Sequence, residues 1–336
     1  MNLIKGIFFT CLLLALHYPQ LGIAQDIHFS QYYASPMNLN PALTGQFDGD
    51  YRIVGNFRNQ WSSITIPYKT FGVSGDARYF LNNPFVHTGL AVYNDVTGDS
   101  EFTSTQIMLS GAFSYPLDHD SIHVINFGLQ PTYHTRSIDY SKLRFDNQYS
   151  VKYGHYDPSL PSGENFNKSN ENLLDLNTGF TWRINLSPRN NFTSGIGIYH
   201  LFEPESELFD SDEVHRRMTY HINGQLKMAS MLDALPGISF MSQGQSEELV
   251  FGSSFRYLIN GFSTLHLGYW YRNNDAGFVT AGLTHQNVYA GFSYDFNSSD
   301  LKEASNGRGG VEFSIIYIIR KFDKRISTFT SCPDYI

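Results

Sequence analysis

The sequence predicts an all-β fold, a transmembrane antiparallel β-barrel of about 14 strands. Three observations predict it: apolar and polar residues alternate along most of the chain, the alternating segments run for about 10 to 13 residues, and charged residues are scarce. Tilted membrane strands need roughly 9 to 11 residues, whereas strands of soluble sheets usually take about 5 to 6. Charged residues make up 16% of the chain, so the polar faces fit a lumen better than a surface in bulk solvent.

Residues 217–228 show the alternation clearly. Successive side chains of a strand point to opposite faces, so this segment has an apolar face and a hydrogen-bonding face. The apolar face consists of Met218, Tyr220, Ile222, Leu226 and Met228, and the polar face of Thr219, His221, Asn223, Gln225 and Lys227. Residues 103–115 and 288–296 repeat the pattern. Aromatic residues gather at segment ends, as the interfacial girdles of a barrel require: Trp61, Tyr79, Tyr115, Tyr133, Trp182 and Tyr271.

About fourteen segments carry the pattern, and single-chain bacterial barrels have an even number of strands. They lie near 51–61, 68–80, 86–95, 103–116, 122–136, 174–185, 191–202, 217–228, 237–243, 248–259, 263–272, 277–285, 287–297 and 310–322. The connections give a second argument, because barrels place short turns in the periplasm and long loops outside. Even-numbered connections, including 187–190 and 232–236, are short. The long ones, 137–173, 203–216 and 298–309, are all odd-numbered. We therefore expect a protein of the Gram-negative outer membrane, in contact with membrane lipid, with both termini in the periplasm.

The first residues predict a signal peptide that ends at Ala24. Lys5 supplies a positive charge, an apolar run follows over residues 7–16, and Gly22 to Ala24 offer small residues for cleavage. The run is about half of the roughly 20 residues that span a bilayer. The chain then divides into a signal peptide (1–24), an N-terminal segment (25–50), the barrel (51–322) and a periplasmic C-terminal tail (323–336).

Three short runs mark the mature chain. Residues 28–31 contain Phe29, Ser30 and Gln31, residues 40–45 contain Asn40, Pro41 and Gly45, and the first strand ends on Arg58, Asn59, Gln60 and Trp61. With Cys332-Pro333 and Tyr335 near the end, these runs closely resemble the PorP/SprF family of type IX secretion system membrane proteins. The likeness extends over the whole mature chain. One departure is the end, Asp334-Tyr335-Ile336, which adds a residue beyond the aromatic that usually closes such chains.

The resemblance implies an outer-membrane barrel that works with other type IX secretion components in gliding and related bacteria. It implies a large, adhesin-like partner with a type B C-terminal domain, which the barrel helps to export or to anchor at the cell surface. The alternative function is an outer-membrane transporter of hydrophobic small molecules, because barrels of about 14 strands with an N-terminal plug include fatty-acid channels.

Residues 25–50 form either a plug in the lumen or a loose periplasmic leader. The Asn40-Pro41 step favours an extended or turn conformation, and Gly45 permits a sharp bend before the first strand. Arg58 and Gln60 share the polar face of the first strand, and Asp76 and Arg78 share that of the second. Because a charge inside a barrel needs a partner, we expect these side chains to pair in the lumen.

The long connection 137–173 is rich in aromatic residues. They are Tyr140, Phe145, Tyr149, Tyr153, Tyr156 and Phe166. Such residues anchor protein interfaces, so the connection is a candidate site for the secreted partner. The alternative is that the aromatics pack on one another and cap the barrel.

Other kinds of function have little support in the sequence. No Gly-x-Ser-x-Gly motif occurs, and no serine or histidine has an evident catalytic partner, so we expect no enzyme. The acidic stretch 203–213 lacks the spacing of a calcium loop and the histidines lack ligand spacing, so we expect no metal and no cofactor. The net charge of −8 and the absence of a basic tract argue against nucleic-acid binding. Cys332 alone would remain after cleavage, with no internal disulfide partner.

Overall fold

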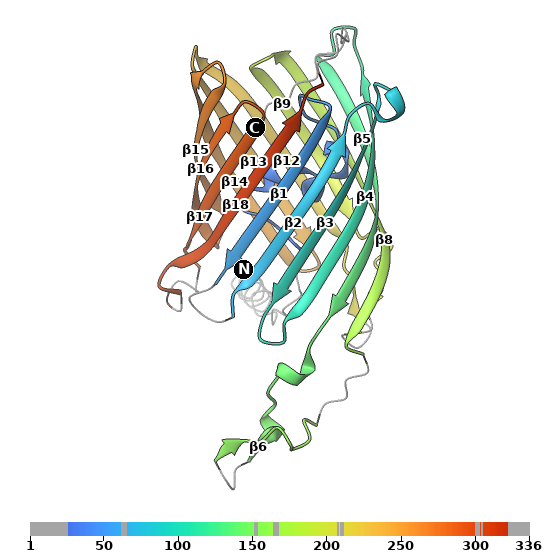
Figure 1. The fold of residues 1–336 in the computed structure, drawn as a ribbon, viewed down its shortest axis with the longest axis vertical. Helices are drawn as coiled ribbons and strands as arrows, with labels where there is room; N and C mark the ends of the chain where they lie inside the picture. The colour runs from blue at the N-terminus through green and yellow to red at the C-terminus, as the bar shows by residue number, and fades with distance from the viewer. Residues whose placement is uncertain are drawn as a thin grey trace, which may run out of the picture.

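The computed structural model describes residues 26–61, 66–150, 154–163, 168–206, 208, 212–299, 303 and 305–321. The expected signal peptide and C-terminal tail lie outside these residues. Within them, 14 antiparallel strands close into one barrel (Figure 1). The strands are β1 (Tyr51–Gln60), β2 (Tyr68–Ala77), β3 (Val86–Thr97), β4 (Phe102–Pro116), β5 (His123–Ser137), β8 (Asn170–Ser187), β9 (Asn190–Tyr199), β12 (Arg217–Ala229), β13 (Leu232–Gln243), β14 (Ser246–Asn260), β15 (Ser263–Arg272), β16 (Ala276–His285), β17 (Val288–Asn297) and β18 (Arg308–Ile319). The fold class that the sequence predicts is confirmed.

Each barrel strand pairs with the barrel strands before and after it in the chain, and β1 closes the barrel against β18. Tyr51, the first residue of β1, lies opposite Ile319, the last residue of β18. Both lie at the end of the barrel that carries the short turns, which we call the short-turn end. The other end carries the connections after β1, β3, β5, β9, β13, β15 and β17, and we call it the long-connection end. Two-stranded hairpins, β6 (Tyr149–Ser150) with β7 (His155–Tyr156) and β10 (Glu205–Ser206) with β11 (Asp212–Glu213), lie in two of these connections.

Some predicted strand ends are wrong. Residues 232–236, expected as a turn, belong to β13, where Pro236 lies opposite Ser253 of β14. Proline lacks an N–H group and resembles a strand breaker in sequence, but the paired strand holds it in place. Trp61 and Tyr79, expected inside strands, follow the ends of β1 and β2 and have left-handed backbones with φ of 57°.

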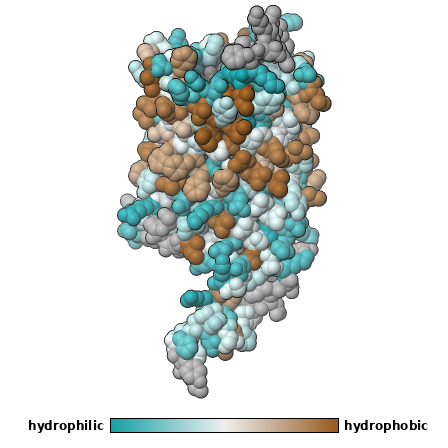
Figure 2. All heavy atoms as spheres, in the orientation of Figure 1, coloured by the Kyte–Doolittle hydropathy of each residue, from teal (hydrophilic) through white to brown (hydrophobic). Residues whose placement is uncertain are grey.

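The barrel wall is apolar outside and polar inside. In β17, Val288, Phe292 and Phe296 are exposed, whereas Ser293 and Asp295 are buried. Figure 2 shows the hydrophobic side chains gathered across the wall, with hydrophilic side chains toward both ends. The largest fully buried side chains include three arginines, Arg58, Arg183 and Arg217. This arrangement inverts that of a soluble protein and suits lipid outside the wall.

The N-terminal segment, residues 26–50, lies inside the barrel (Figure 1). It contains the 3-10 helix η1 (Tyr32–Ala34), the helix α2 (Pro36–Leu39) and the 3-10 helix η2 (Pro41–Leu43). No helix in the described part of the chain is long and apolar enough to cross a membrane. The segment runs along the barrel: Asp26 contacts residues of the long-connection end, and the segment leads into β1 at the short-turn end. The first barrel strand begins and the last one ends at the short-turn end, for which the loop lengths predict a periplasmic location. Asp26 lies at the opposite end of the lumen.

Glycines of the wall make room for this segment. A Cβ atom on Gly128 of β5 would collide with the backbone of Pro41, and one on Gly179 of β8 would collide with Asn40. Both glycines have their free face toward the lumen, where the segment turns through η2. The close approach of the segment's backbone at Gly128, and of the Asn40 side chain at Gly179, therefore requires the smallest residue at these positions.

Candidate functional site

A carboxylate of the wall, that of Glu312, binds the backbone of the N-terminal segment. Glu312 of β18 accepts hydrogen bonds from the backbone N–H groups of Ser30 and Gln31, at 2.6 Å and 2.9 Å. Arg58 lies 3.3 Å from the same carboxylate and donates to the carbonyl of His28 at 3.0 Å. Two of the predicted residues, Ser30 and Arg58, thus meet on a glutamate that the sequence analysis did not single out.

The Ser30 side chain extends this network. Its hydroxyl donates to Asp295 at 2.8 Å and accepts from Arg272 at 2.6 Å. Arg272 also pairs with Glu248 at 3.1 Å. We call Arg58, Glu248, Arg272, Asp295 and Glu312 the charged cluster. Its members lie on five strands, β1, β14, β15, β17 and β18, and in the sequence only the alternation pattern indicates that they point inward.

Gln31, Phe29 and Tyr32 add further contacts. Gln31 accepts a hydrogen bond from Ser314 at 2.9 Å, and Phe29 packs against Tyr93 with ring centroids 6.2 Å apart. Tyr32 donates to Asn223 at 2.9 Å. The Phe29-Ser30-Gln31 run is therefore bonded through both its backbone and its side chains.

The second predicted run holds the middle of the segment. Asn40 caps η2 by accepting from the N–H of Ala42 at 2.9 Å, and its amide donates to the carbonyl of Phe180 at 3.2 Å. Pro41 starts η2, where its missing N–H costs nothing. Gly45 has φ of 74°, and its N–H donates to Asp76 at 2.7 Å. This bend turns the chain toward β1.

The expected pairing of Arg58 with Asp76 does not occur. Asp76 of β2 pairs with Arg52 of β1, which donates to both carboxylate oxygens at 2.9 Å and 2.7 Å. The register explains this, because Arg52 lies opposite Asp76 near the short-turn end, whereas Arg58 is six residues further along β1. Arg78 donates to the carbonyl of Phe47 at 2.8 Å.

The remaining residues of the third run lie at the edge of the lumen. Asn59 and Gln60 are half-buried at the end of β1. Trp61 follows the strand and packs edge to face on Tyr68, with ring centroids 4.8 Å apart. Of the four residues, only Arg58 reaches the N-terminal segment through the contacts described above.

Asp26 at the start of the segment binds a histidine. Its carboxylate lies 2.6 Å from Nε2 of His200, and Nδ1 of His200 lies 2.7 Å from Asp175 of β8. Arg217 lies 3.6 Å from Asp26 and donates to the carbonyl of Ile27. Burial alone would raise the pKa of Asp26, but His200 and Arg217 hold it well below its ordinary value. Sequence analysis did not predict this cluster, because its members are far apart in the chain.

The connection between β5 and β8 forms an arm that projects from the barrel (Figure 1), and its described residues are 138–150, 154–163 and 168–169. At its base, Asp139 donates its N–H to Ser100 at 3.0 Å and Lys142 pairs with Glu101. Further out, Tyr156 donates to Gln148 at 3.2 Å within the hairpin region. The base of the arm is thus bonded to the connection between β3 and β4, and its outer part is held by contacts within the arm.

The described aromatic residues of the arm differ in their exposure. Tyr149 is 53% exposed, whereas Tyr140, Phe145 and Tyr156 are half-buried. Arg144 lies over the ring of Tyr156, with its guanidinium carbon 5.1 Å from the centroid. Tyr153 and Phe166 lie outside the described residues.

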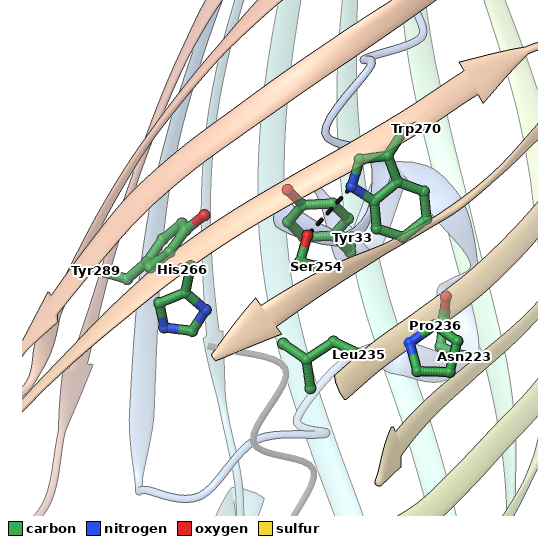
Figure 3. A pocket seen from close by; sticks show the side chains of 8 residues that line it. All are labelled: Tyr33, Asn223, Leu235, Pro236, Ser254, His266, Trp270 and Tyr289. Atoms are coloured by element: carbon green, nitrogen blue, oxygen red, sulfur yellow. Dashed lines mark hydrogen bonds between the residues drawn. The ribbon is translucent and has the colours of Figure 1, made fainter. Parts of the chain in front are cut away.

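A small cavity remains between the segment and the wall (Figure 3). Tyr33 of the segment faces Trp270, with ring centroids 5.6 Å apart, and Trp270 donates to Ser254 at 3.2 Å. His266 and Tyr289 complete the aromatic side of the cavity. Its volume of about 20 Å³ is close to the space of one water molecule. Among the residues that the structure describes, no group of three or more His, Cys, Asp or Glu side chains is placed to hold a metal ion.

Comparisons with known proteins agree with this architecture. The toluene transporter TbuX of Ralstonia pickettii has a TM-score of 0.53 at 11% identity, over 84% of this chain and 92% of its own. The monoaromatic hydrocarbon channel CymD has a TM-score of 0.51 at 12% identity, over 90% of this chain and 96% of its own. At such identities the likeness shows the fold alone, that of an outer-membrane barrel. No curated protein matches the sequence. The family described as type IX secretion system membrane protein PorP/SprF matches residues 22–317, so the chain belongs to this family.

Proposed function

We propose that this outer-membrane barrel holds a secreted partner protein at the cell surface and does not conduct it through its own lumen. The observation that carries this proposal is the N-terminal segment inside the barrel. Residues 26–47 are bonded to the wall along the whole lumen, from Asp26 at one end to the Gly45–Asp76 contact near the other. An extended polypeptide that passed through the barrel would have to share the lumen with this segment.

The segment is held too firmly to leave at frequent intervals. Hydrogen bonds to charged groups each contribute about 1.5 to 3 kcal/mol, and this segment makes several of them with Glu312, Asp295 and Asp76. The segment also carries Asp26, which pairs with the buried Arg217 of the wall. Breaking a buried ion pair by removing one partner costs about 3 to 5 kcal/mol. A closed lumen therefore favours anchoring over conduction as the role of this chain in type IX secretion.

The arm is our candidate for the partner contact. We place the long-connection end outside the cell and the short-turn end in the periplasm, because long loops of outer-membrane barrels face outward. This places the arm, with its exposed Tyr149, where a secreted protein arrives. By its family resemblance, the chain would bind an adhesin-like protein with a type B C-terminal domain.

The decisive experiment removes the arm. Deletion of residues 145–166 should leave a heat-modifiable barrel in the outer membrane but release the partner into the medium or leave it unexported. Tyr149→Ala should weaken attachment in the same direction, because exposed tyrosines contribute strongly to interfaces. The matched control is Tyr257→Ala, which removes a tyrosine of similar exposure from the outer face of β14. Normal surface display after the deletion would rule out the arm and direct attention to the connection 200–216.

Transport of hydrophobic small molecules is the alternative, and the structural likeness to hydrocarbon channels is what favours it. The cavity of about 20 Å³ beside Tyr33 is too small for a hydrocarbon ring unless the segment moves. Uptake of toluene by cells that carry the barrel separates the two functions. Uptake above that of cells without the barrel, together with normal partner display after deletion of the arm, would support transport over anchoring.

A further inference from the structure

The start of the N-terminal segment is held by a histidine between two carboxylates. Nε2 of His200 lies 2.6 Å from Asp26, and Nδ1 lies 2.7 Å from Asp175. An ionised carboxylate only accepts hydrogen bonds, so both ring nitrogens must carry a proton and the ring is an imidazolium. His200 directly follows β9 and begins the connection to β12.

The groups around His200 balance its charge. Asp26 faces it from the segment, Asp175 from β8, and Arg217 of β12 lies 3.6 Å from Asp26. His134 of β5 stacks on the ring, with centroids 6.5 Å apart. All of these side chains are buried. Two carboxylates, one imidazolium and one guanidinium sum to zero, so loss of the imidazolium proton leaves an uncompensated buried negative charge.

The other bonds of this end come from the same part of the wall. Gln243, at the end of β13, accepts the N–H of Asp26 at 2.8 Å, and Arg217 donates to the carbonyls of Ile27 and Asn38 at 3.2 Å and 3.3 Å. Gln243 in turn donates to the carbonyl of His215 at 3.2 Å. Both ends of the connection 200–216 are thus linked to the start of the segment. His200 binds Asp26 directly, and His215 is linked to it through Gln243.

We propose that His200 in its protonated form is a latch through which the connection 200–216 controls whether the N-terminal segment closes the lumen. With the latch closed, Asp26 is fixed and the segment fills the barrel. When His200 withdraws or loses its proton, the first residues of the segment detach and a water-filled path opens along the wall. Control of the latch by a partner outside the cell rests on the proposed function, which places the long-connection end outside. The latch itself does not depend on that placement.

The proton affinity of His200 sets the expected size of the effect. Burial would lower the pKa of His200, but Asp26 and Asp175 raise it from 6.5 to about 9. A raised pKa means that the latch is complete below about pH 6.5 and is lost as the pH rises through about 9. By linkage, the difference between 6.5 and about 9 means that protonation of His200 shifts the equilibrium between the latched and released states toward the latched state by about two orders of magnitude.

The test measures access to a residue that the closed segment buries. Ile27 is buried directly after Asp26, so Ile27→Cys in a Cys332→Ser background should react slowly with a small water-soluble thiol reagent at pH 7. His200→Ala should raise the labelling rate by roughly 10-fold to 100-fold and raise the ion conductance of the purified full-length barrel in planar bilayers. The matched control is His285→Gln, because His285 is exposed at the end of β16 and should change neither readout.

The pH dependence provides a second arm that needs no substitution. Conductance of the unaltered barrel should rise as the pH passes about 9, whereas that of His200→Ala should be high and flat from about pH 6.5 to 10. The latch is overturned if the His200→Ala barrel still shows the same rise in conductance at high pH. It is also overturned if the His200→Ala barrel is labelled slowly while it still migrates as a folded, heat-modifiable species. If His200→Ala does not assemble, a conductance without any rise near pH 9 in the unaltered barrel refutes the proposal. Loss of partner display after deletion of the arm tests the proposed function separately.

Discussion

Glu312 offers the sharpest test of how the lumen is held closed. Its carboxylate accepts two backbone N–H groups of the segment and pairs with Arg58, and the side chain is nearly inaccessible to solvent. Glu312→Ala removes the nearer of the two carboxylates that pair with the buried Arg58, leaving Asp295 at 3.7 Å, and it leaves the N–H groups of Ser30 and Gln31 without their acceptor. Removal of one partner from a buried ion pair costs about 3 to 5 kcal/mol, so we expect a loss of that size in the free energy of unfolding.

The measurement is urea unfolding of the barrel refolded into lipid vesicles, followed by proteolysis of the N-terminal segment in the folded state. The matched control is Glu247→Ala, which removes an exposed glutamate at the start of β14 and should cost less than about 0.5 kcal/mol. The double variant Arg58→Met with Glu312→Gln removes both charges and should cost less than the sum of the two single changes. A loss below about 1 kcal/mol for Glu312→Ala, with the segment still protected from protease, would refute the role assigned to the charged cluster.

Three further outcomes are expected. Gly128→Ala should displace the segment and raise the conductance, because a Cβ there collides with the segment backbone. Its control, Gly111→Ala, has open space around its Cβ and should leave the conductance unchanged. Equal conductance of the two variants would contradict the close approach. Phe292→Arg on the exposed face of β17 should cost about 2 to 4 kcal/mol in vesicle unfolding, and a cost near zero would argue against lipid at that face. A cysteine at Tyr149 should react with an impermeant label in intact cells, and one at Asn83 only after the outer membrane is opened; the reverse pattern would overturn the orientation.

Much of the barrel could be predicted from the sequence because its signal is local. Alternation in stretches such as 217–228 depends only on which face a side chain occupies, and a strand has a period of two whatever its neighbours are. The predicted segments lie on the 14 observed strands. The ends of the strands were harder to predict. For example, β13 begins at Leu232, ahead of the proline that suggested a turn. Local propensity is weak where a partner strand supplies the hydrogen bonds.

The candidate site was predictable only in part. The short runs drew attention to Ser30, Gln31, Asn40 and Gly45, and each of these residues contacts the wall from inside the lumen. Their partners were not predictable, since the N–H of Ser30 meets a carboxylate 282 positions away in the chain. The pairing of Asp76 with Arg52 likewise follows from strand register, which no single strand reveals.

The sequence by itself determined that this chain forms an outer-membrane barrel with an apolar outer face, because strand periodicity and loop lengths are written locally. Only the tertiary structure decided that the segment before β1 fills the lumen, that Asp26 lies at the long-connection end, and that His200 binds it between two carboxylates. The physical reason is that closure of the barrel brings residues from distant strands to one point. Buried charges are stable there only when such partners meet, and their meeting depends on register and curvature of the whole wall.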